Sequence, residues 1–150
     1  MKKTGVTFST FDLLHPGHIL MLEDCKRVCD YLIVGVQSDP TIDRKKSEDS
    51  YSKISGKPKN SPIQTLEERL IMIKAIKFVD EVRSYTTESS LIDLLKEINP
   101  DVRILGADHK GKKFTGDELN IKCVFNSRDH GYSTRELRKR VYNAEKNRLI

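Results

Sequence analysis

Two histidines, His15 and His18, are the residues of this chain whose type and spacing are best suited to chemistry. The apolar run at 6–8 predicts a buried strand before them, and the apolar residues at 19–22 predict a helix after them. Positions three apart share one face of a helix, so both imidazoles can point at one spot above the end of the strand. A helix start also presents unpaired N–H groups and a positive dipole end at that spot. Two imidazoles above an anion site predict phosphate chemistry.

The residues between the two histidines, Pro16 and Gly17, suit the same site. Proline fits the first turn of a helix, and glycine, which has no Cβ, allows another group to approach the backbone closely. A lone histidine at a helix start is more often a solvated or capping residue. The functional hypothesis therefore depends on the pair with Gly17 between them.

Alternating apolar and amphipathic segments indicate the strands and helices that hold these residues in place. This order predicts an α/β domain with a parallel sheet, a single domain over residues 1–150. Ligands collect beyond the carboxyl ends of such strands, so the histidine pair and the segments at 106–108 and 128–133 should meet at one edge. The polar stretch at 37–62 predicts a long functional loop. The expected strands are 6–8, 31–36, 79–82, 102–105 and 121–125, and the expected helices are 17–28, 66–77, 90–98 and 133–148.

Composition narrows the class of protein. The net charge is +5, the charged fraction is 33%, and the chain has three cysteines and no tryptophan. A basic surface suits a nucleic acid or a small polyphosphate, and the absence of aromatic residues among the basic clusters disfavours the nucleic acid. No apolar run approaches the roughly 20 residues that span a bilayer. Cys25 and Cys29 predict core packing. We expect a reduced, cytoplasmic protein that binds neither membrane nor nucleic acid.

Three motifs carry a resemblance to a known family. Thr10-Phe11-Asp12, followed by the histidine pair, resembles the signature of the HxGH nucleotidyltransferase superfamily. Within it, the cytidylyltransferase family, which includes the glycerol-3-phosphate enzymes, is the most similar. The segment at 106–111 resembles the Gly-Asp-Asp-Trp-x-Gly motif of that family, and the segment at 128–134 resembles its second nucleotide motif, in the same order. The resemblance implies a Rossmann-like three-layer sandwich with a five-stranded parallel sheet.

The resemblance also implies the reaction. A substrate phosphate would attack the α-phosphorus of CTP, or of ATP, and pyrophosphate would leave. No covalent intermediate is needed, so the protein positions the reactants and neutralises charge. Mg²⁺ would accompany the triphosphate, no residue is expected as a metal ligand, and a homodimer is expected.

Site roles carried over from the family fall into three groups. Catalytic contacts are expected of His15, His18, Arg69 and Lys45, and substrate contacts of Asp12, Lys45 and Lys46. Simpler roles stay open: Ser133 as a helix cap, the lysines as solvated charges, and Asp12 and Asp108 as turn residues. The expected nucleotide-binding residues are Thr10, Phe11, His15, Gly17, His18, Gly106, Asp108, Arg128, Gly131, Ser133 and Thr134.

Three functions follow from these patterns. The first is a cytidylyltransferase that makes a CDP-linked product from CTP and a small phosphorylated alcohol. The second is an adenylyltransferase that uses ATP on a sugar phosphate, because residues 57–69 resemble heptose-phosphate adenylyltransferases. The third is a non-catalytic module that binds nucleotides or polyanions, against which the intact histidine pair argues. Departures from the family pattern, such as Ser9 for glycine and His109 for tryptophan, leave the acceptor open.

Overall fold

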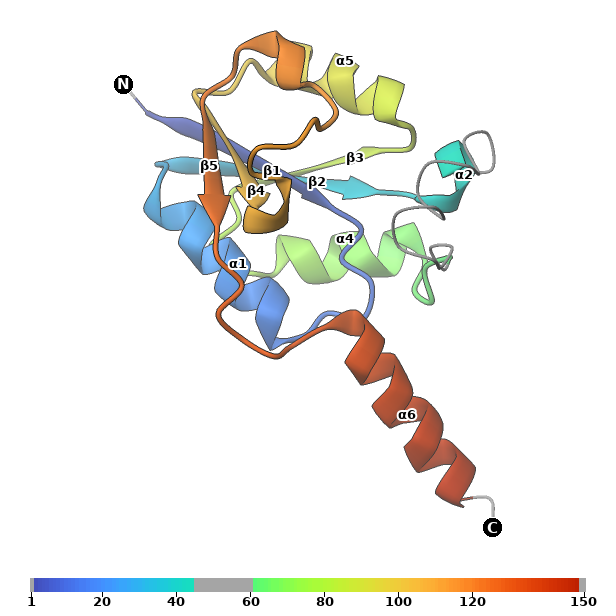
Figure 1. Ribbon diagram of the computed structural model, residues 1–150. Helices are drawn as coiled ribbons and strands as arrows, with labels where there is room; N and C mark the ends of the chain where they lie inside the picture. The colour runs from blue at the N-terminus through green and yellow to red at the C-terminus, as the bar shows by residue number, and fades with distance from the viewer. Residues whose placement is uncertain (1, 45–60, 149–150) are drawn as a thin grey trace.

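Five parallel strands lie at the centre of the structure, a computed structural model that describes residues 2–44 and 61–148 (Figure 1). Their spatial order, β3-β2-β1-β4-β5, reverses direction between β1 and β4. In sheets of this kind ligands bind beyond the carboxyl ends, where the order reverses. The loops after β1 and β4 therefore flank the expected site. The strands are β1 (Thr4–Ser9), β2 (Tyr31–Gln37), β3 (Glu81–Tyr85), β4 (Val102–Gly106) and β5 (Cys123–Asn126).

Helices cover both faces of the sheet, which confirms the predicted three-layer α/β fold. Helices α1 (Pro16–Arg27) and α4 (Leu66–Lys74) lie on one face, and α5 (Glu88–Ile98) lies on the other (Figure 1). A short helix, α2 (Thr41–Arg44), follows β2. The last helix, α6 (Thr134–Arg148), projects away from the sheet (Figure 1) and has no buried residue.

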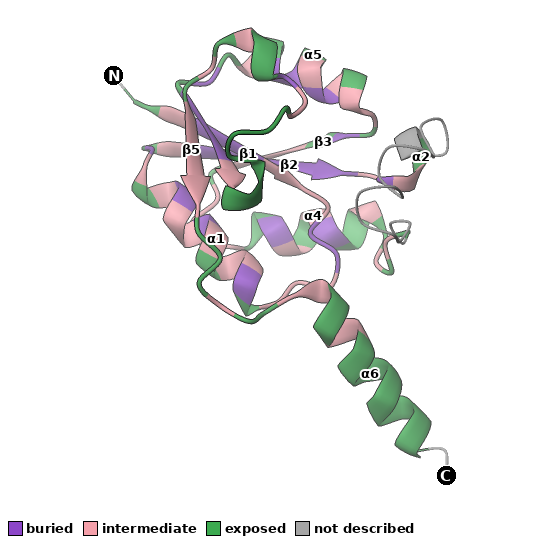
Figure 2. Ribbon diagram, viewed as in Figure 1, coloured by how far each residue is buried: buried purple, intermediate pink, exposed green. Residues whose placement is uncertain are grey.

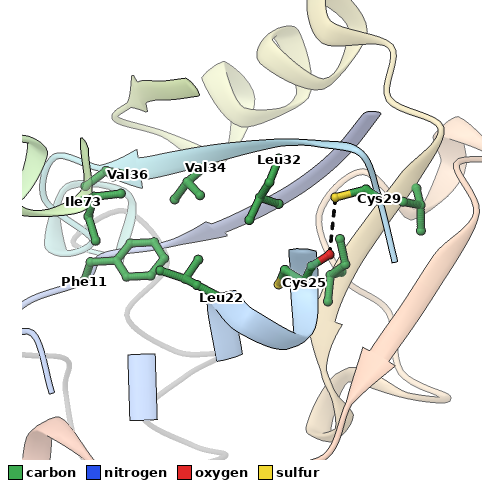
Figure 3. Packing of buried hydrophobic residues seen from close by; sticks show 10 residues of the cluster. Phe11, Leu22, Cys25, Cys29, Leu32, Val34, Val36 and Ile73 are labelled. Carbon is green, nitrogen blue, oxygen red and sulfur yellow. Dashed lines mark hydrogen bonds between the residues drawn. The ribbon is translucent and has the colours of Figure 1, made fainter. Parts of the chain in front are cut away.

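The two faces of the sheet have separate cores, because side chains alternate along each strand. Leu32 and Val34 of β2 pack with Leu22 of α1 and Ile73 of α4 (Figure 3). Ile33, between them in sequence, packs instead in the cluster that contains the leucines of α5. Cys25 of α1 and Cys29, two residues after this helix, lie in the same cluster as Leu32 and Val34. The Cys29 thiol donates to the Cys25 carbonyl at 3.3 Å. Their predicted role as core residues is confirmed.

Several predicted boundaries are wrong by two or three residues because local hydrogen bonds set the ends of the elements. Helix α5 begins at Glu88 rather than at 90, since the Thr87 hydroxyl accepts from the Ser90 amide at 3.0 Å. Helix α4 ends before 77, where the Ala75 amide donates to the Met72 carbonyl. The third and fifth strands lie at 81–85 and 123–126 instead of 79–82 and 121–125.

The predicted loop at 37–62 contains regular structure at its start, because Gln37 belongs to β2 and residues 41–44 form α2. Residues 45–60 lie outside the described part of the chain. None of the helices in the described ranges combines the length and the hydrophobicity of a membrane-spanning segment.

Candidate active site

His15 and His18 form the N-terminal cap of α1 through their side chains. Nδ1 of His15 accepts from the Gly17 amide at 3.0 Å, and Nδ1 of His18 accepts from the His15 amide at 3.1 Å. The two rings lie nearly stacked, with centroids 3.9 Å apart and planes inclined by 30°. The spacing that predicted a shared helix face thus brings the imidazoles into contact.

The surroundings keep both imidazoles neutral at physiological pH. Burial is the largest cause that lowers the pKa of His18, to about 3, and the neighbouring His15 and Arg128 act in the same direction, against the opposing effect of Asp12. Burial also lowers the pKa of His15, with His130 and Arg128 as further causes. A neutral imidazole whose Nδ1 accepts a hydrogen bond carries its proton on Nε2. Both rings therefore present an Nε2–H donor, which suits an anionic oxygen.

The loop between β1 and α1 holds a strained backbone. Phe11 and Leu13 have φ values of 55° and 51°, in the left-handed region that non-glycine residues rarely adopt. Phe11 is 1% exposed, and the Asp12 carboxylate accepts from the amides of Ile63 and Gln64 at 2.9 and 3.0 Å. Strain of this kind persists only where surrounding contacts maintain it, and it concentrates at functional sites.

Arg69 is buried against this loop and binds backbone carbonyl groups. Its side chain is 1% exposed, and its guanidinium donates to carbonyl oxygens of three segments: Thr10 after β1, the end of β2, and the residues before α4. The bond from Nη1 to the Thr10 carbonyl is 2.9 Å long. The sequence predicted a phosphate or acceptor contact for Arg69. The geometry favours a positioning role, because these bonds engage every nitrogen of the guanidinium.

The segment after β5 approaches the loop after β1 from the far end of the chain. The Thr134 hydroxyl donates to the Asp12 carbonyl at 3.2 Å, and Arg138 of α6 lies 4.0 Å from the Asp12 carboxylate. The Ser133 hydroxyl accepts from the Glu136 amide at 3.1 Å, so Ser133 is a helix cap. A capped helix start still presents amides to an anion, and the expected nucleotide role of Ser133 stays a prediction.

The motif after β4 reaches the same edge of the sheet. A Cβ built on Gly106 would lie 2.5 Å from the Asp108 carboxylate and 3.8 Å from Nε of Arg128, so these three residues lie together. Gly131 has open space where a side chain would stand. The structure thus brings the predicted nucleotide-binding residues into one region. Lys45 and Lys46 lie outside the described residues.

The sequence analysis did not single out His130, which lies against the same glycine as His15. A Cβ on Gly17 would lie 2.8 Å from Cε1 of both His15 and His130. Only glycine leaves room for the two rings there. The sequence did contain a signal for His130, because this histidine lies within the segment at 128–134 that resembles a nucleotide-binding motif.

The donor groups at this site fit an anion rather than a bare metal ion. Within residues 2–44 and 61–148, no group of three or more His, Cys, Asp or Glu is placed to hold a metal. The Asp12 carboxylate already accepts two amides. Mg²⁺ commonly binds through phosphate oxygens and water with few protein carboxylates, so it could accompany a triphosphate here.

Comparison with known proteins gives a consistent result. Residues 6–140 match the family described as cytidylyltransferase-like. The chain is 35% identical over 140 residues to the bifunctional protein HldE of Campylobacter jejuni, covering 93% of this chain and 28% of that protein. The HldE of Caulobacter vibrioides is 32% identical over 143 residues, covering 93% and 27%. The chain therefore spans little more than a quarter of the length of these curated relatives.

Solved structures agree on the fold. The lipopolysaccharide core biosynthesis protein of Thermoplasma volcanium is 27% identical, with a TM-score of 0.60 over 85% of this chain and 96% of that one. A pantoate-beta-alanine ligase of Francisella tularensis has a TM-score of 0.52 at 16% identity, covering 84% of this chain and 59% of that one. The second likeness concerns the fold alone.

Proposed function

Because this chain belongs to the cytidylyltransferase-like family of nucleotidyltransferases, we propose that it transfers a nucleotidyl group from a nucleoside triphosphate to a phosphorylated sugar. The observation that carries this proposal is the pair of neutral imidazoles at the start of α1, each with Nε2–H available to an anionic oxygen. The site stands at the carboxyl edge of a parallel sheet where the strand order reverses.

In the proposed reaction, an oxygen of the acceptor phosphate attacks the α-phosphorus. The bond between that phosphorus and the bridging oxygen breaks, and pyrophosphate leaves with the electron pair. His15 and His18 donate to phosphate oxygens and stabilise the charge that develops on the bridging oxygen. The amides at the start of α6 hold the terminal phosphates. Thr10 and Phe11 hold the α-phosphate through their backbone groups.

We propose ATP as the nucleotide and a sugar phosphate as the acceptor. The likeness to a lipopolysaccharide core biosynthesis protein supports a sugar acceptor, and the resemblance of residues 57–69 to heptose-phosphate adenylyltransferases supports ATP. Mg²⁺ would accompany the triphosphate, and a homodimer remains an expectation.

A second candidate uses CTP and a phosphorylated alcohol. The cytidylyltransferase-like description of the family favours it, together with the likeness of residues 10–18 to the glycerol-3-phosphate enzymes. The two candidates share the phosphate chemistry and differ only in the base and the acceptor.

Initial rates of pyrophosphate release separate the candidates. The full chain is assayed with ATP or CTP and Mg²⁺ against sugar 1-phosphates, including a heptose phosphate, and against glycerol 3-phosphate. We expect release with ATP and a sugar phosphate only. Release restricted to CTP and glycerol 3-phosphate would establish the second candidate instead. No release with any pair would contradict both and favour a non-catalytic binding module.

A further inference from the structure

We propose that His130 is a third phosphate-binding imidazole, which donates Nε2–H to the terminal phosphates that leave as pyrophosphate. This inference rests on the proposed function and adds a residue to the same site. It is carried by the place of His130 against Gly17 and by the hydrogen bond that orients its ring.

A backbone amide orients the ring of His130, as it does the rings of His15 and His18. Its Nδ1 accepts from the Tyr132 amide at 3.2 Å, and it packs against the Tyr132 ring with centroids 5.5 Å apart. In the neutral ring the proton is therefore on Nε2. Within the described part of the chain, Nε2 of His130 makes no hydrogen bond. Three imidazoles thus share one arrangement: a backbone amide fixes Nδ1, and Nε2–H is available to a ligand.

Gly17 allows the rings from the two ends of the chain to meet. The position where a Cβ would stand is 2.8 Å from Cε1 of both His15 and His130, and Cε1 adjoins Nε2 in each ring. His15 turns its Cε1–Nδ1 edge toward Gly17, since its Nδ1 accepts from the Gly17 amide, so its Nε2 is directed away from the Gly17 backbone. The two rings also interact electrostatically. After burial, His130 is the next largest cause that lowers the pKa of His15.

The position of His130 along the chain indicates which phosphates it meets. It lies between Arg128, whose charge acts on His15 and His18, and Ser133, which caps α6. His15 and His18 belong to the start of α1, whereas His130 belongs to the segment that leads into α6 and reaches across to Gly17. An anion held between the two helix starts would place its terminal phosphates beside His130.

Two substitutions separate the donor from the local structure. In His130→Asn, the side-chain oxygen can still accept from the Tyr132 amide, but the group at the position of Nε2 is lost. In His130→Gln, an amide nitrogen can reach that position and donate. Binding is measured by calorimetry with ATP, AMP and inorganic pyrophosphate on the full chain in Mg²⁺, and with CTP and CMP if CTP is the nucleotide used.

We expect His130→Asn to weaken the binding of triphosphate and pyrophosphate by about tenfold, the effect of losing one hydrogen bond to a charged group. Monophosphate binding should stay unchanged, and His130→Gln should retain most of the affinity. Lys146→Ala, which removes a charge near the far end of α6, serves as a control that should leave all the affinities unchanged. Circular dichroism verifies that each variant is folded.

The outcomes distinguish this inference from the proposed function. One outcome is that the wild-type chain releases pyrophosphate while His130→Asn binds triphosphate as tightly as the wild type. In that case the inference is wrong and the function stands. An equal loss for monophosphate and triphosphate would contradict the assignment to the terminal phosphates. If the wild-type chain binds neither triphosphate nor pyrophosphate, both the function and this inference fail.

Discussion

The two halves of the candidate phosphate site differ in how they are held. The α1 half, residues 10–18, is partly buried, with Phe11, Asp12 and Gly17 shielded from solvent, and the α6 half, residues 128–134, has no buried residue. Phe11 is 1% exposed and Asp12 is 9% exposed, whereas α6 has no buried residue (Figure 2). The more buried half is the better placed to fix the geometry of the reacting atoms.

Contacts from distant segments maintain the α1 half. Arg69 joins the loop after β1 to the end of β2, and Asp12 binds the amides that precede α4. The α6 half makes fewer contacts with the body of the protein, notably the bond from the Thr134 hydroxyl to the Asp12 carbonyl. The α1 half is therefore preorganised by folding, whereas we expect a bound ligand to help align the donor groups of the α6 half.

The largest expected effect follows from removing the guanidinium under the α1 half. Arg69→Met leaves several buried carbonyl groups without a donor, and each such group costs about 1–3 kcal/mol. We expect the free energy of unfolding to fall by at least about 3 kcal/mol in urea titrations. Arg83→Met is the matched control, because Arg83 is 36% exposed and its surface pairs contribute about 0–1 kcal/mol. Equal losses in the two variants would contradict the positioning role.

The second prediction concerns catalysis in the α1 half. His18→Asn keeps an acceptor for the His15 amide but removes the Nε2–H donor. We expect kcat/KM to fall by about 10²-fold or more, as when a stabilising donor is lost, with a small change in the urea midpoint. Turnover within a few-fold of wild type would show that the imidazole does not act on the transition state.

A third prediction uses the low pKa of His18 in the folded state. The folded ring titrates at about 3 and the unfolded ring near 6.5, so between these values the unfolded chain binds a proton that the folded chain does not. The stability of the wild type should therefore fall as the pH falls from 6.5 towards 3, by up to about 1.4 kcal/mol per pH unit from this group. Urea titrations of wild type and His18→Asn at several pH values isolate this contribution. Parallel pH profiles would contradict it.

The smallest expected effect lies in the α6 half. Ser133→Ala removes the cap of α6, which costs about 1 kcal/mol of helix stability. Hydrogen exchange should quicken in the first turns of α6 and remain unchanged in α1. Ser133→Thr retains a capping hydroxyl and should restore protection. If exchange also quickened in α1, the two halves would be more tightly coupled than their contacts indicate.

The sequence predicted the α/β fold and the histidine pair because both depend on short-range patterns. Apolar runs and helical spacing encode the strand-helix alternation, and His15 caps the helix that contains His18, three residues along the chain. The boundaries were less predictable, since single caps such as Thr87 set them.

Arg69 and His130 were not predictable in the same way. An arginine that binds phosphate and one that binds buried carbonyls look identical in a sequence, and the carbonyls that Arg69 meets include Thr10 and Gln37, far from it along the chain. The contact of His130 with Gly17 likewise depends on the fold bringing the segment after β5 back to α1.

The proposal behind these predictions is that three imidazoles at this site carry their protons on Nε2 and present them to a phosphate chain. Nitrogen-15 NMR of the histidine rings at about pH 8, where an unperturbed imidazole is neutral, tests this most directly. The claim predicts Nε2–H tautomers for His15, His18 and His130, and a shift of each Nε2–H signal on addition of ATP or CTP with Mg²⁺. Nδ1–H tautomers, or Nε2–H signals that neither nucleotide moves, would contradict it.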